Sequence, residues 1–426
     1  TWYQMGAALN GEAFGDNHGG AVSLSGDGMR LAVGAIKHDD GGADTGHTRV
    51  YQWLSSSWKQ LGGDLGDEVG FAAGDEAGSA VSLSKDGSRV AVGAAQVGSS
   101  GKGKVGVYQY VDPSGVNDDP TSGVWTQLGD DLEGDATDDR SGSTIALSGS
   151  GARIAIGAPY NDPTNDLTDA GHVQVWEWNA LGGTEAWRPM GVAITGKVAG
   201  DLSGWSVSLS DDGSRLAFGG IEEEGYGVWK GHVRVFEWNA TADAWVQLGE
   251  DFTGDVAEDY FGTSVSLSAD GDHVAIGASE HDSGEGDDKV SSIGHVKVYQ
   301  YNETSGLWLQ LGEDIDGEKQ RDKSGASISL SADGTRVAIG EPGSDDAGLL
   351  NAGRVRIYQY DPASNWTIVG TAQDGEAAGD NAGVSVSISD DGERFAVGSS
   401  ENSNGVGRVW VYSLVANPPP PPPPRP

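Results

Sequence analysis

The feature that most constrains the fold of this chain is an internal repeat marked by a short turn. Between two apolar runs the chain carries Asp-Gly, or Ser-Gly in one copy, and successive turns lie 58 to 64 residues apart. Asp-Gly in this context is a strong hairpin signal, because Gly tolerates positive φ. The turns begin at Asp27, Asp86, Ser150, Asp212, Asp270, Asp333 and Asp391. Seven copies of one unit therefore make up most of the chain.

Each repeat predicts four short strands. In the clearest copy these are Ser264–Ser268, His273–Ala278, His295–Tyr301 and Leu307–Gly312, which are rich in β-branched or aromatic residues and bounded by Gly, Asp, Asn or Ser. First and second strands carry small side chains, third strands carry aromatic ones, and fourth strands open with Trp. This gradient suits blades that radiate from an axis, since gaps between blades widen outward and need bulkier side chains.

The fourth predicted strand of the repeat is shifted by one repeat relative to the other three, and this shift predicts how the ring closes. Its opening tryptophans are Trp2, Trp58, Trp125, Trp187, Trp245, Trp308 and Trp366. The chain starts on such a segment, and the seventh repeat stops after its third strand, Arg408–Leu414. We therefore expect the N-terminal strand to pair beside Arg408–Leu414 and complete the last blade. This predicts an all-β fold, a seven-bladed β-propeller of four-stranded antiparallel blades spanning residues 1–415.

The repeat resembles a known family. Phe261-Gly262, Gly277-Ala278 and Gly294-x-Val-x-Val are similar to the FG-GAP repeat of integrin α-subunit propellers, and Gly157-Ala158-Pro159 supplies a literal GAP. In wording the chain looks most like the DGxRVAVGA repeats of secreted and cell-surface proteins of marine microbes and microalgae, most of which have no assigned activity. The resemblance spans all seven repeats and implies an extracellular or cell-surface location. FG-GAP repeats that bind calcium carry Asp-x-Asp-x-Asp-Gly, which no copy here has, so calcium is not implied.

Charge limits the partners that the chain can have. The net charge is −38, from 64 acidic and 26 basic residues. Nucleic-acid binding and attraction to anionic membranes both need a basic surface. No apolar run approaches the ~20 residues of a membrane span, and the absence of cysteine excludes disulfides and thiol chemistry. The acidic loops at 37–46, 160–170, 279–293 and 344–352 predict at most weak binding of divalent cations.

One aspartate recurs three residues before the Gly that opens each first strand. We interpret it as an acceptor of backbone N–H bonds in the preceding turn, because a feature present in every blade is architectural. The alternative is a ring of carboxylates at the channel mouth that binds a cation. The seven residues are Asp16, Asp75, Asp139, Asp201, Asp259, Asp322 and Asp380.

Basic residues recur at two further positions. One lies at the start of second strands and the other at the start of third strands. Because Lys and Arg replace His at the start of third strands, metal ligation is not expected there. We expect these residues to form buried hydrogen bonds or ion pairs with the recurring aspartates. Second strands open with Arg30, Arg89, Arg153, Arg215, His273, Arg336 and Arg394. Third strands open with His47, Lys104, His172, His232, His295, Arg354 and Arg408. The motifs of known catalytic, metal and phosphate sites are missing, so we predict no catalytic residue, metal or cofactor.

Departures from the repeat are where a ligand face is expected, because folding does not require them. Blade four departs most, since Trp205 takes a position held in the other blades by Gly, Ser, Thr, Ala or Val. Aromatic rings beside carboxylates suit a basic partner or a glycan. The alternative is local packing. The predicted face consists of Trp205, Glu222, Glu223, Glu224, Tyr226, Trp229, Tyr260 and Phe261.

Two features suggest an extracellular assembly. Asn239, Asn302 and Asn365 open Asn-x-Ser/Thr sequons in exposed hairpins, so N-glycosylation is predicted there. Residues 416–426 contain seven consecutive prolines, which form a stiff polyproline II rod. The chain is thus predicted to be a non-enzymatic structural or interaction module, a bead joined through a proline rod to a larger chain or to copies of itself. The alternative is an adhesion propeller that binds a glycan or a protein through its acidic loops; an enzyme is the least favoured class.

Overall fold

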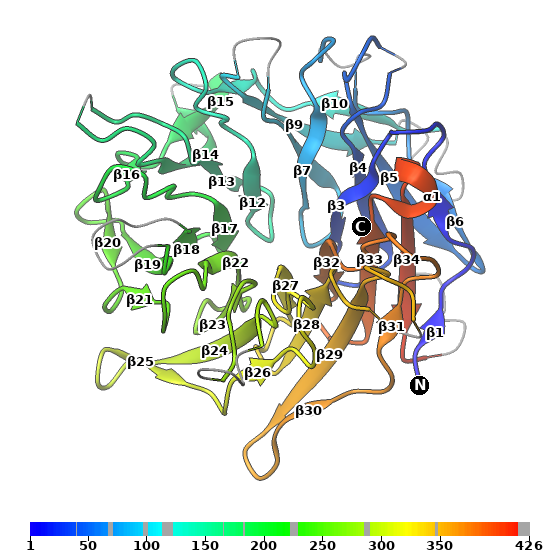
Figure 1. Ribbon diagram of the computed structural model, residues 1–426. Helices are drawn as coiled ribbons and strands as arrows, with labels where there is room; N and C mark the ends of the chain where they lie inside the picture. The colour runs from blue at the N-terminus through cyan, green and yellow to red at the C-terminus, as the bar shows by residue number, and fades with distance from the viewer. Residues whose placement is uncertain are drawn as a thin grey trace.

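The computed structural model confirms the ring (Figure 1). It describes residues 1–39, 41–66, 71–96, 101–112, 122–164, 166–181, 184–221, 229–284, 290–345 and 348–415. The proline-rich segment 416–426 lies outside the described residues, so its predicted rod conformation stays a prediction. Among the described residues, no helix is long and apolar enough to cross a membrane.

Seven antiparallel sheets radiate from a common centre, and each has four main strands, which follow chain order in blades one to six. Inner strands are β3 (His18–Leu24), β7 (Ala77–Leu83), β12 (Thr144–Leu147), β17 (Ser206–Leu209), β22 (Phe261–Leu267), β27 (Ser327–Leu330) and β32 (Ser385–Ile388). Second strands are β4 (Arg30–Ala35), β8 (Arg89–Ala94), β13 (Arg153–Ala158), β18 (Arg215–Gly220), β23 (His273–Ala278), β28 (Arg336–Glu341) and β33 (Arg394–Ser399).

The outer half of each blade consists of a long third strand and a short outer strand. Third strands are β5 (His47–Leu54), β9 (Lys104–Val111), β14 (His172–Leu181), β19 (His232–Asn239), β24 (His295–Asn302), β29 (Arg354–Asp361) and β34 (Arg408–Ser413). Outer strands are β6 (Ser57–Gln60), β10 (Val124–Gln127), β15 (Thr184–Pro189), β20 (Ala244–Gln247), β25 (Leu307–Gln310), β30 (Asn365–Ile368) and β1 (Tyr3–Gln4). Short strands that also pair with third strands are β2 (Leu9–Asn10), β11 (Leu132–Glu133), β16 (Ile194–Thr195), β21 (Phe252–Thr253), β26 (Ile315–Asp316) and β31 (Gln373–Asp374).

The two ends of the propeller meet in blade seven, as the phase of the repeat predicts. Strand β1 pairs antiparallel with β34, with Tyr3 opposite Ser413 and Gln4 opposite Tyr412. Trp2 packs edge-on against Phe395 of the same blade, with ring centroids 4.7 Å apart. The outer edge of β34 is therefore covered, which removes the exposed edge that an open array would leave.

Each blade is joined to its neighbour by the tryptophan that opens its outer strand. All seven indole N–H groups donate to a backbone carbonyl of the preceding blade, at 2.7–3.1 Å. The pairs are Trp2–Val369, Trp58–Met5, Trp125–Leu61, Trp187–Leu128, Trp245–Met190, Trp308–Leu248 and Trp366–Leu311. Seven apolar clusters fill the gaps between blades, where inner-strand residues such as Val81 and Leu83 face Ala32 and Val50 of the blade before. The bulky tryptophan thus both fills the outer gap and satisfies its own donor.

A second circle of bonds surrounds the axis, at the turns between first and second strands. One residue in each turn donates its N–H to the carbonyl of the equivalent residue in the next blade, at 2.8–3.0 Å, and the seventh returns to the first. The circle runs Gly26, Lys85, Gly149, Asp211, Ala269, Ala332, Asp390. The Lys85 ammonium lies 2.5 Å from Asp211 and 2.7 Å from Asp390, which belong to blades four and seven. Because every member both donates and accepts, no turn has an unpaired group at this position.

A serine in the inner strand adds a third type of bond between blades, and it is missing once. Ser Oγ accepts the N–H of a Leu or Ile in the next blade at 2.9–3.1 Å. The pairs are Ser23–Leu83, Ser82–Leu147, Ser208–Leu267, Ser266–Leu330, Ser329–Ile388 and Ser387–Leu24. Ala146 takes the serine position in blade three, so the corresponding bond to Leu209 is not made.

We expect Ala146→Ser to stabilise the ring, because the new hydroxyl would accept the N–H of Leu209 as its six counterparts do. The free energy of unfolding should rise by about 1 kcal/mol, the usual contribution of one hydrogen bond. Urea unfolding followed by tryptophan fluorescence measures this change, with Ser329→Ala as the matched loss of a bond. A stabilisation by Ser329→Ala, or a loss of stability in Ala146→Ser, would contradict this account of the inner strands.

Candidate functional site

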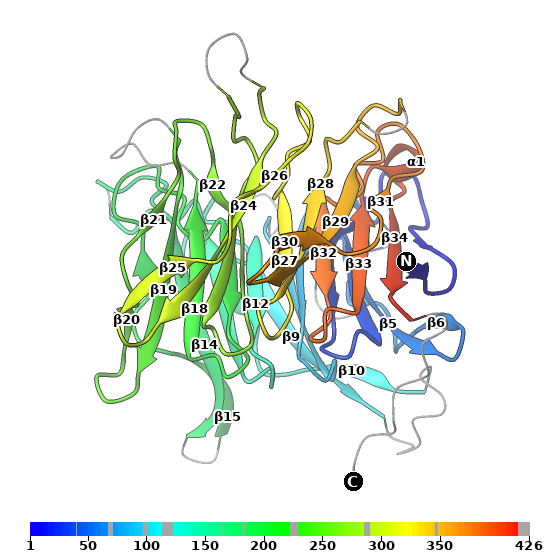
Figure 2. The same cartoon turned by 90° about the horizontal axis from the view of Figure 1, so that it is seen from below.

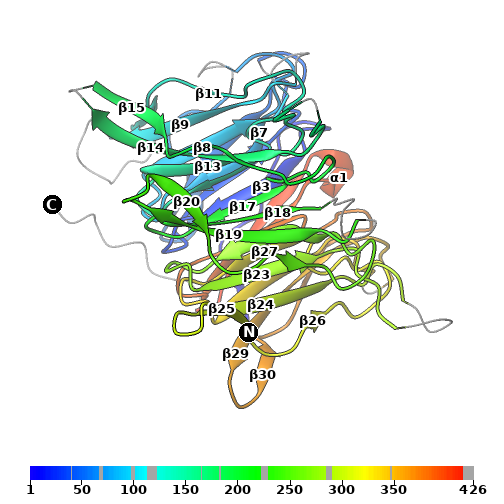
Figure 3. The same ribbon diagram turned by 90° about the vertical axis from the view of Figure 1, so that its left-hand side faces the viewer.

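The two faces of the propeller differ, and one carries the predicted chemistry. Loops that lead into first strands, and loops between second and third strands, share the face on which the short helix α1 (Asn402–Gly405) lies. The β14–β15 hairpin extends on the opposite face (Figure 2). Figure 3 shows the β29–β30 hairpin projecting from the rim.

All seven recurring aspartates are buried on this first face and accept backbone N–H groups from the turn before them. The N–H donors lie three or four residues earlier in the chain, at 2.6–2.9 Å in the shortest bond of each turn. They belong to Ala13, Ala72, Ala136, Lys197, Val256, Lys319 and Ala377. These carboxylates are therefore engaged in holding the loops, and they offer few free oxygen atoms to a shared cation at the channel mouth.

Side chains from the loop after the second strand satisfy several of these aspartates further. His38 Nδ1 lies 3.3 Å from Asp16, and His281 Nδ1 lies 3.0 Å from Asp259. At the same loop position of blade three, Asn161 donates to Asp139 at 3.0 Å. The loop after the second strand is thus tied to the loop before the first strand within one blade.

Basic residues at the start of second strands reach across to the next blade. Arg30 donates to the carbonyl of Gly87 at 2.9 Å, Arg89 to that of Gly151 at 3.1 Å, and Arg336 to that of Gly392 at 3.0 Å. Their partners are turn carbonyls and not the recurring aspartates. These guanidinium groups therefore brace the turns of neighbouring blades.

Histidines at the start of third strands are uncharged. Burial, together with nearby positive groups, lowers the pKa of His47 to about 4 and that of His232 to about 3. Burial also lowers the pKa of His172. A neutral imidazole does not form an ion pair at pH 7, so these residues act as buried polar side chains.

One group of three side chains in the described part of the chain has the composition of a metal site. The ligand atoms of Asp255, His295 and Asp314 lie within 4.8 Å of one another. The Lys297 ammonium lies 2.6 Å from Asp255 Oδ2 and 3.6 Å from Asp314 Oδ2, while burial lowers the pKa of His295 to about 4. Lys297 already supplies a positive charge to both carboxylates, so this group gives no specific support to a metal ion.

The predicted ligand face of blade four is only partly brought together. Glu222, Glu223, Glu224 and Tyr226 lie outside the described residues. Trp229 is 40% exposed, and its ring centroid lies 6.0 Å from that of Tyr260. Trp205 is half-buried just before β17, whereas Phe261 is buried and packs in the core between blades four and five. Phe261 therefore cannot present its ring to a partner.

The predicted glycosylation sites lie at the hairpins between third and outer strands. Asn239 and Asn302 are exposed, and the side-chain oxygen of each accepts two backbone N–H groups of its own turn at 3.0 Å. Asn365 is half-buried with φ of 65°, and its oxygen accepts the N–H of Glu313 in the preceding blade at 3.0 Å. Asn365 thus also helps to join blades five and six.

A broad polar pocket opens between blades six and seven on the face that carries α1. It has a volume of about 870 Å³ and is lined by Asn351, the turn 376–381, Glu401, Asn402 and Arg408. Gly379 and Asn381, with φ of 80° and 53°, shape the turn that forms its wall. Asp380 is buried and accepts the N–H groups of Glu376 and Ala377 at 3.0 and 2.8 Å. The recurring aspartate therefore fixes the backbone from which Glu376 projects.

Glu376 and Arg408 form an ion pair in this pocket. The Arg408 guanidinium donates to Glu376 Oε2, and its Nε donates to Asn10 Oδ1 at 2.7 Å. The Glu376 side chain is 56% exposed and the Arg408 side chain 25%, so solvent reaches both. Sequence analysis identified Arg408 as a repeat position but missed Glu376. The available signal was the acidic residue four positions before the recurring aspartate, which several repeats share.

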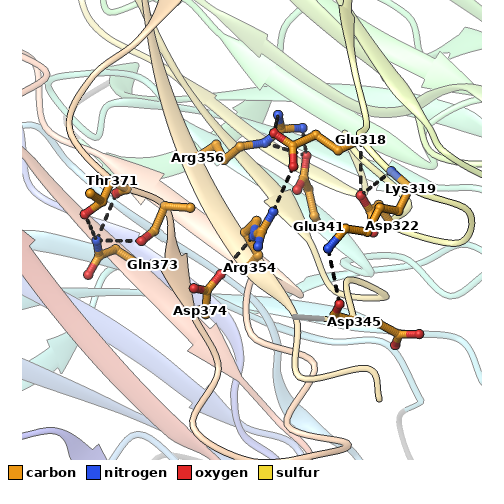
Figure 4. Close-up of polar contacts among 11 residues, drawn as sticks. Glu318, Lys319, Asp322, Glu341, Asp345, Arg354, Arg356, Thr371, Gln373 and Asp374 are labelled. Carbon is orange, nitrogen blue, oxygen red and sulfur yellow. Dashed lines mark hydrogen bonds and ion pairs between the residues drawn. The ribbon is translucent and has the colours of Figure 1, made fainter. Parts of the chain in front are cut away.

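A second cluster missed by the sequence analysis lies between blades five and six (Figure 4). Arg356 Nε donates to Glu341 Oε1 at 2.9 Å, and Arg356 also contacts Glu318 at 3.2 Å. Arg354 bridges Glu318 at 3.2 Å and Asp374 at 2.8 Å. Burial raises the pKa of Glu341, although the charge of Arg356 opposes this shift. The signal in the sequence was Glu341 itself, which ends a second strand where the other blades have Ala, Gly or Ser.

Comparisons with known proteins support the fold and do not name a family. No protein-family model matches the chain, and no curated protein matches it either. Among solved structures, it is similar to the periplasmic gluconolactonase of Pseudomonas aeruginosa, with a TM-score of 0.50 and 16% identity. It is also similar to a "putative 6-phosphogluconolactonase" from Bacteroides uniformis, with a TM-score of 0.52 and 13% identity. Each likeness covers 84% of this chain and 85% of the other.

These comparisons correct the prediction of a non-enzymatic structural or interaction module. That prediction assumed that so regular a repeat leaves no room for an active site, yet propellers of the same architecture carry the names of lactonases. Regularity of the repeat therefore does not exclude an enzyme. The FG-GAP resemblance is corrected in part, because the propeller is present but no family model supports that repeat type. At 13–16% identity the likeness establishes the fold.

The buried histidines make stability depend on pH. Burial, with the charge of Arg49, lowers the pKa of His18 to about 3 from 6.5. The unfolded chain therefore takes up a proton between pH 6.5 and 3 that the folded chain does not, so stability falls as pH falls through this window. Between pH 7 and pH 5, His18 alone should account for about 2 kcal/mol of this loss.

We expect His18→Phe to remove this contribution. Phe261 occupies the same position in blade five, so the substitution uses a residue that the repeat already accepts. Urea unfolding at pH 7 and pH 5 measures the effect, and the variant should lose about 2 kcal/mol less than the wild type between the two. An unchanged difference between the two pH values would show that His18 is not buried in the neutral form.

Proposed function

We propose that this chain is a hydrolase that opens a sugar-derived lactone in the pocket between blades six and seven. The observation that carries the proposal is the solvent-accessible pair of Glu376 and Arg408 within a polar pocket of about 870 Å³. The names of the two similar solved structures suggest the substrate class. A sugar lactone is uncharged and rich in hydroxyl groups, which suits a wall of carboxamides and carboxylates.

The chemistry requires a base and a group that stabilises negative charge. Hydrolysis adds water to the lactone carbonyl, breaks the ring C–O bond and gives a hydroxy acid. The Glu376 carboxylate is placed to accept a proton from the attacking water, and Arg408 to stabilise the charge that develops on the carbonyl oxygen. Asn351 and Asn381 offer amide groups to the ring hydroxyls. Exposure of Glu376 lets it leave the ion pair when a substrate oxygen takes its place beside Arg408.

Other charged groups on the described part of the chain are less suited to this reaction. The recurring aspartates are buried and accept backbone N–H groups. Asp255 and Asp314 share the ammonium of Lys297. Arg354 and Arg356 lie in a largely buried cluster with Glu341. Glu376 and Arg408 combine complementary charges, exposure to solvent and a pocket.

We also propose that the protein acts outside the cytoplasm. The absence of cysteine is compatible with an oxidising compartment, and one similar structure belongs to a protein named as periplasmic. A high negative charge keeps a protein soluble where salt screens its self-repulsion. More specifically, we propose that the protein is extracellular or attached to a cell surface.

The test is lactone hydrolysis by the purified chain. Acid release from glucono-1,5-lactone, followed by pH-stat titration, should exceed the uncatalysed rate. Glu376→Gln should lower kcat by about 100-fold or more, the usual contribution of a general base. Arg408→Ala should also reduce the rate, because both stabilisation of the developing charge and orientation of the substrate are lost.

The matched control is Glu303→Gln, which removes one exposed carboxylate from the hairpin between third and outer strands of blade five. Its rate should equal that of the wild type. The proposed site would be refuted by equal rates for Glu376→Gln and the wild type. Absence of hydrolysis with this lactone and its phosphorylated form would refute the proposed substrate class.

A further inference from the structure

Blade six breaks a pairing that other blades keep. The third residue after the second strand is His38, Asn161 or His281 in blades one, three and five, and each side chain lies 3.0–3.3 Å from the recurring aspartate of its blade. In blade six this residue is Ser344. Its backbone makes the same bonds: its N–H donates to the carbonyl of Glu341, and its carbonyl accepts the N–H of Gly353. The position is therefore equivalent, but the short side chain leaves Asp322 Oδ1 without a partner.

Blade six also places a carboxylate where other blades have a small side chain. The equivalent residues of the other blades are Ala35, Ala94, Ala158, Gly220, Ala278 and Ser399, whereas blade six has Glu341. Glu341 is fully buried, and its Oε1 accepts Arg356 while its Oε2 has no hydrogen-bond partner. A buried carboxylate oxygen that lacks a partner is costly, so a ligand or a proton is required there.

Two buried carboxylate oxygens and two buried hydroxyl oxygens of one small region have no hydrogen-bond partner within 3.5 Å. They are Glu341 Oε2, Asp322 Oδ1, Ser324 Oγ and Ser344 Oγ, all on residues with 0% exposure. Gly343, between Glu341 and Ser344, donates its N–H to the carbonyl of Asp322. Burial and, to a lesser extent, the negative charge of Asp322 raise the pKa of Glu341, whereas hydrogen bonding from the Ser324 side chain lowers it, so both residues lie close to the Glu341 carboxylate. Figure 4 shows Asp322 beside Glu341 on the neighbouring loop.

The nearby guanidinium groups bind oxygen atoms other than these four. Arg356 binds Glu341 through Oε1, Glu318 through a second nitrogen, and the carbonyl of Asp316 at 3.1 Å. Arg354 binds Glu318 and Asp374. The two guanidinium groups thus pair with three carboxylates, those of Glu318, Glu341 and Asp374, and the Asp322 carboxylate lies close to Glu341 in addition.

We propose that Glu341 Oε2, Asp322 Oδ1 and the hydroxyls of Ser324 and Ser344 form a buried binding site for Ca²⁺. Calcium takes carboxylate, hydroxyl and carbonyl oxygens in flexible geometry. Mg²⁺ retains water molecules and suits an enclosed site less well. The site is independent of the lactonase proposal, and it differs from an Asp-x-Asp-x-Asp-Gly loop because its ligands come from two loops and a strand end. In the group of Asp255, His295 and Asp314, Lys297 takes the place that the cation would have.

The test compares calcium binding by the full chain and by Ser344→His. The histidine restores the side chain found in blades one and five, so it should pair with Asp322 and fill the site while the fold is kept. Chelator-treated protein is dialysed against CaCl₂ in about 0.15 M salt, where exposed charges are largely screened. Calcium per chain should fall by one in Ser344→His and in Glu341→Gln, and should be unchanged in Asp345→Asn, which removes one exposed charge nearby.

Thermal unfolding gives a second readout that does not depend on enzymatic activity. Ca²⁺ should raise the Tm of the wild type and of Asp345→Asn with saturation, because a ligand that binds only the folded state stabilises it. The same concentration of Mg²⁺ should have a smaller effect, and Ser344→His should not respond to Ca²⁺ beyond its response to Mg²⁺. Equal calcium stoichiometry in wild type and Ser344→His, no tightly bound calcium, or equal shifts with Ca²⁺ and Mg²⁺ would overturn the proposal.

Discussion

The structure depends on hydrogen bonds that pass from blade to blade and return to their starting point. The indole N–H of each outer-strand tryptophan and the N–H of each axial turn residue donate to a neighbouring blade, at the outer and inner radius of the wedge. Apolar clusters fill the space between these two circles. A single blade exposes both apolar faces, so its stability comes from its neighbours. The bonds set the angle between blades, and hence which loops meet across a gap.

Repetition explains why candidate sites lie where the repeat is broken. Where every blade has the same residue, as with the recurring aspartates, the side chain is engaged in holding backbone. The region that joins blades five and six departs from this rule at Glu341 and Ser344, whereas Glu376 occupies a position that is acidic in several repeats. Arg354 lies between the two proposed sites, since it binds Glu318 on one side and Asp374, two residues before Glu376, on the other.

Much of the fold follows from the sequence, whereas the sites follow from contacts that it does not display. The sequence starts on a fourth-strand segment at Trp2, and the seventh repeat lacks its fourth strand. This was sufficient to predict how blade seven is completed, because the two incomplete ends can supply one four-stranded sheet together. Phe261 was misplaced in a ligand face because its motif does not reveal that its ring points into the core. Glu376 and Arg408 are separated by 32 residues and meet only when two loops converge. The prediction against an enzyme was an inference from regularity, and regular blades still leave irregular loops.

Pairing of β1 with β34 has a consequence for biosynthesis. The first strand of the propeller, β1, finds its partner at Arg408–Ser413, about 400 residues later in the chain, so it remains unpaired while six blades are made. Contacts of such long range form late and slow the completion of folding. Until then the nascent protein has an incomplete seventh sheet with a free edge, which is the point where a chaperone or a second nascent chain has most opportunity to bind.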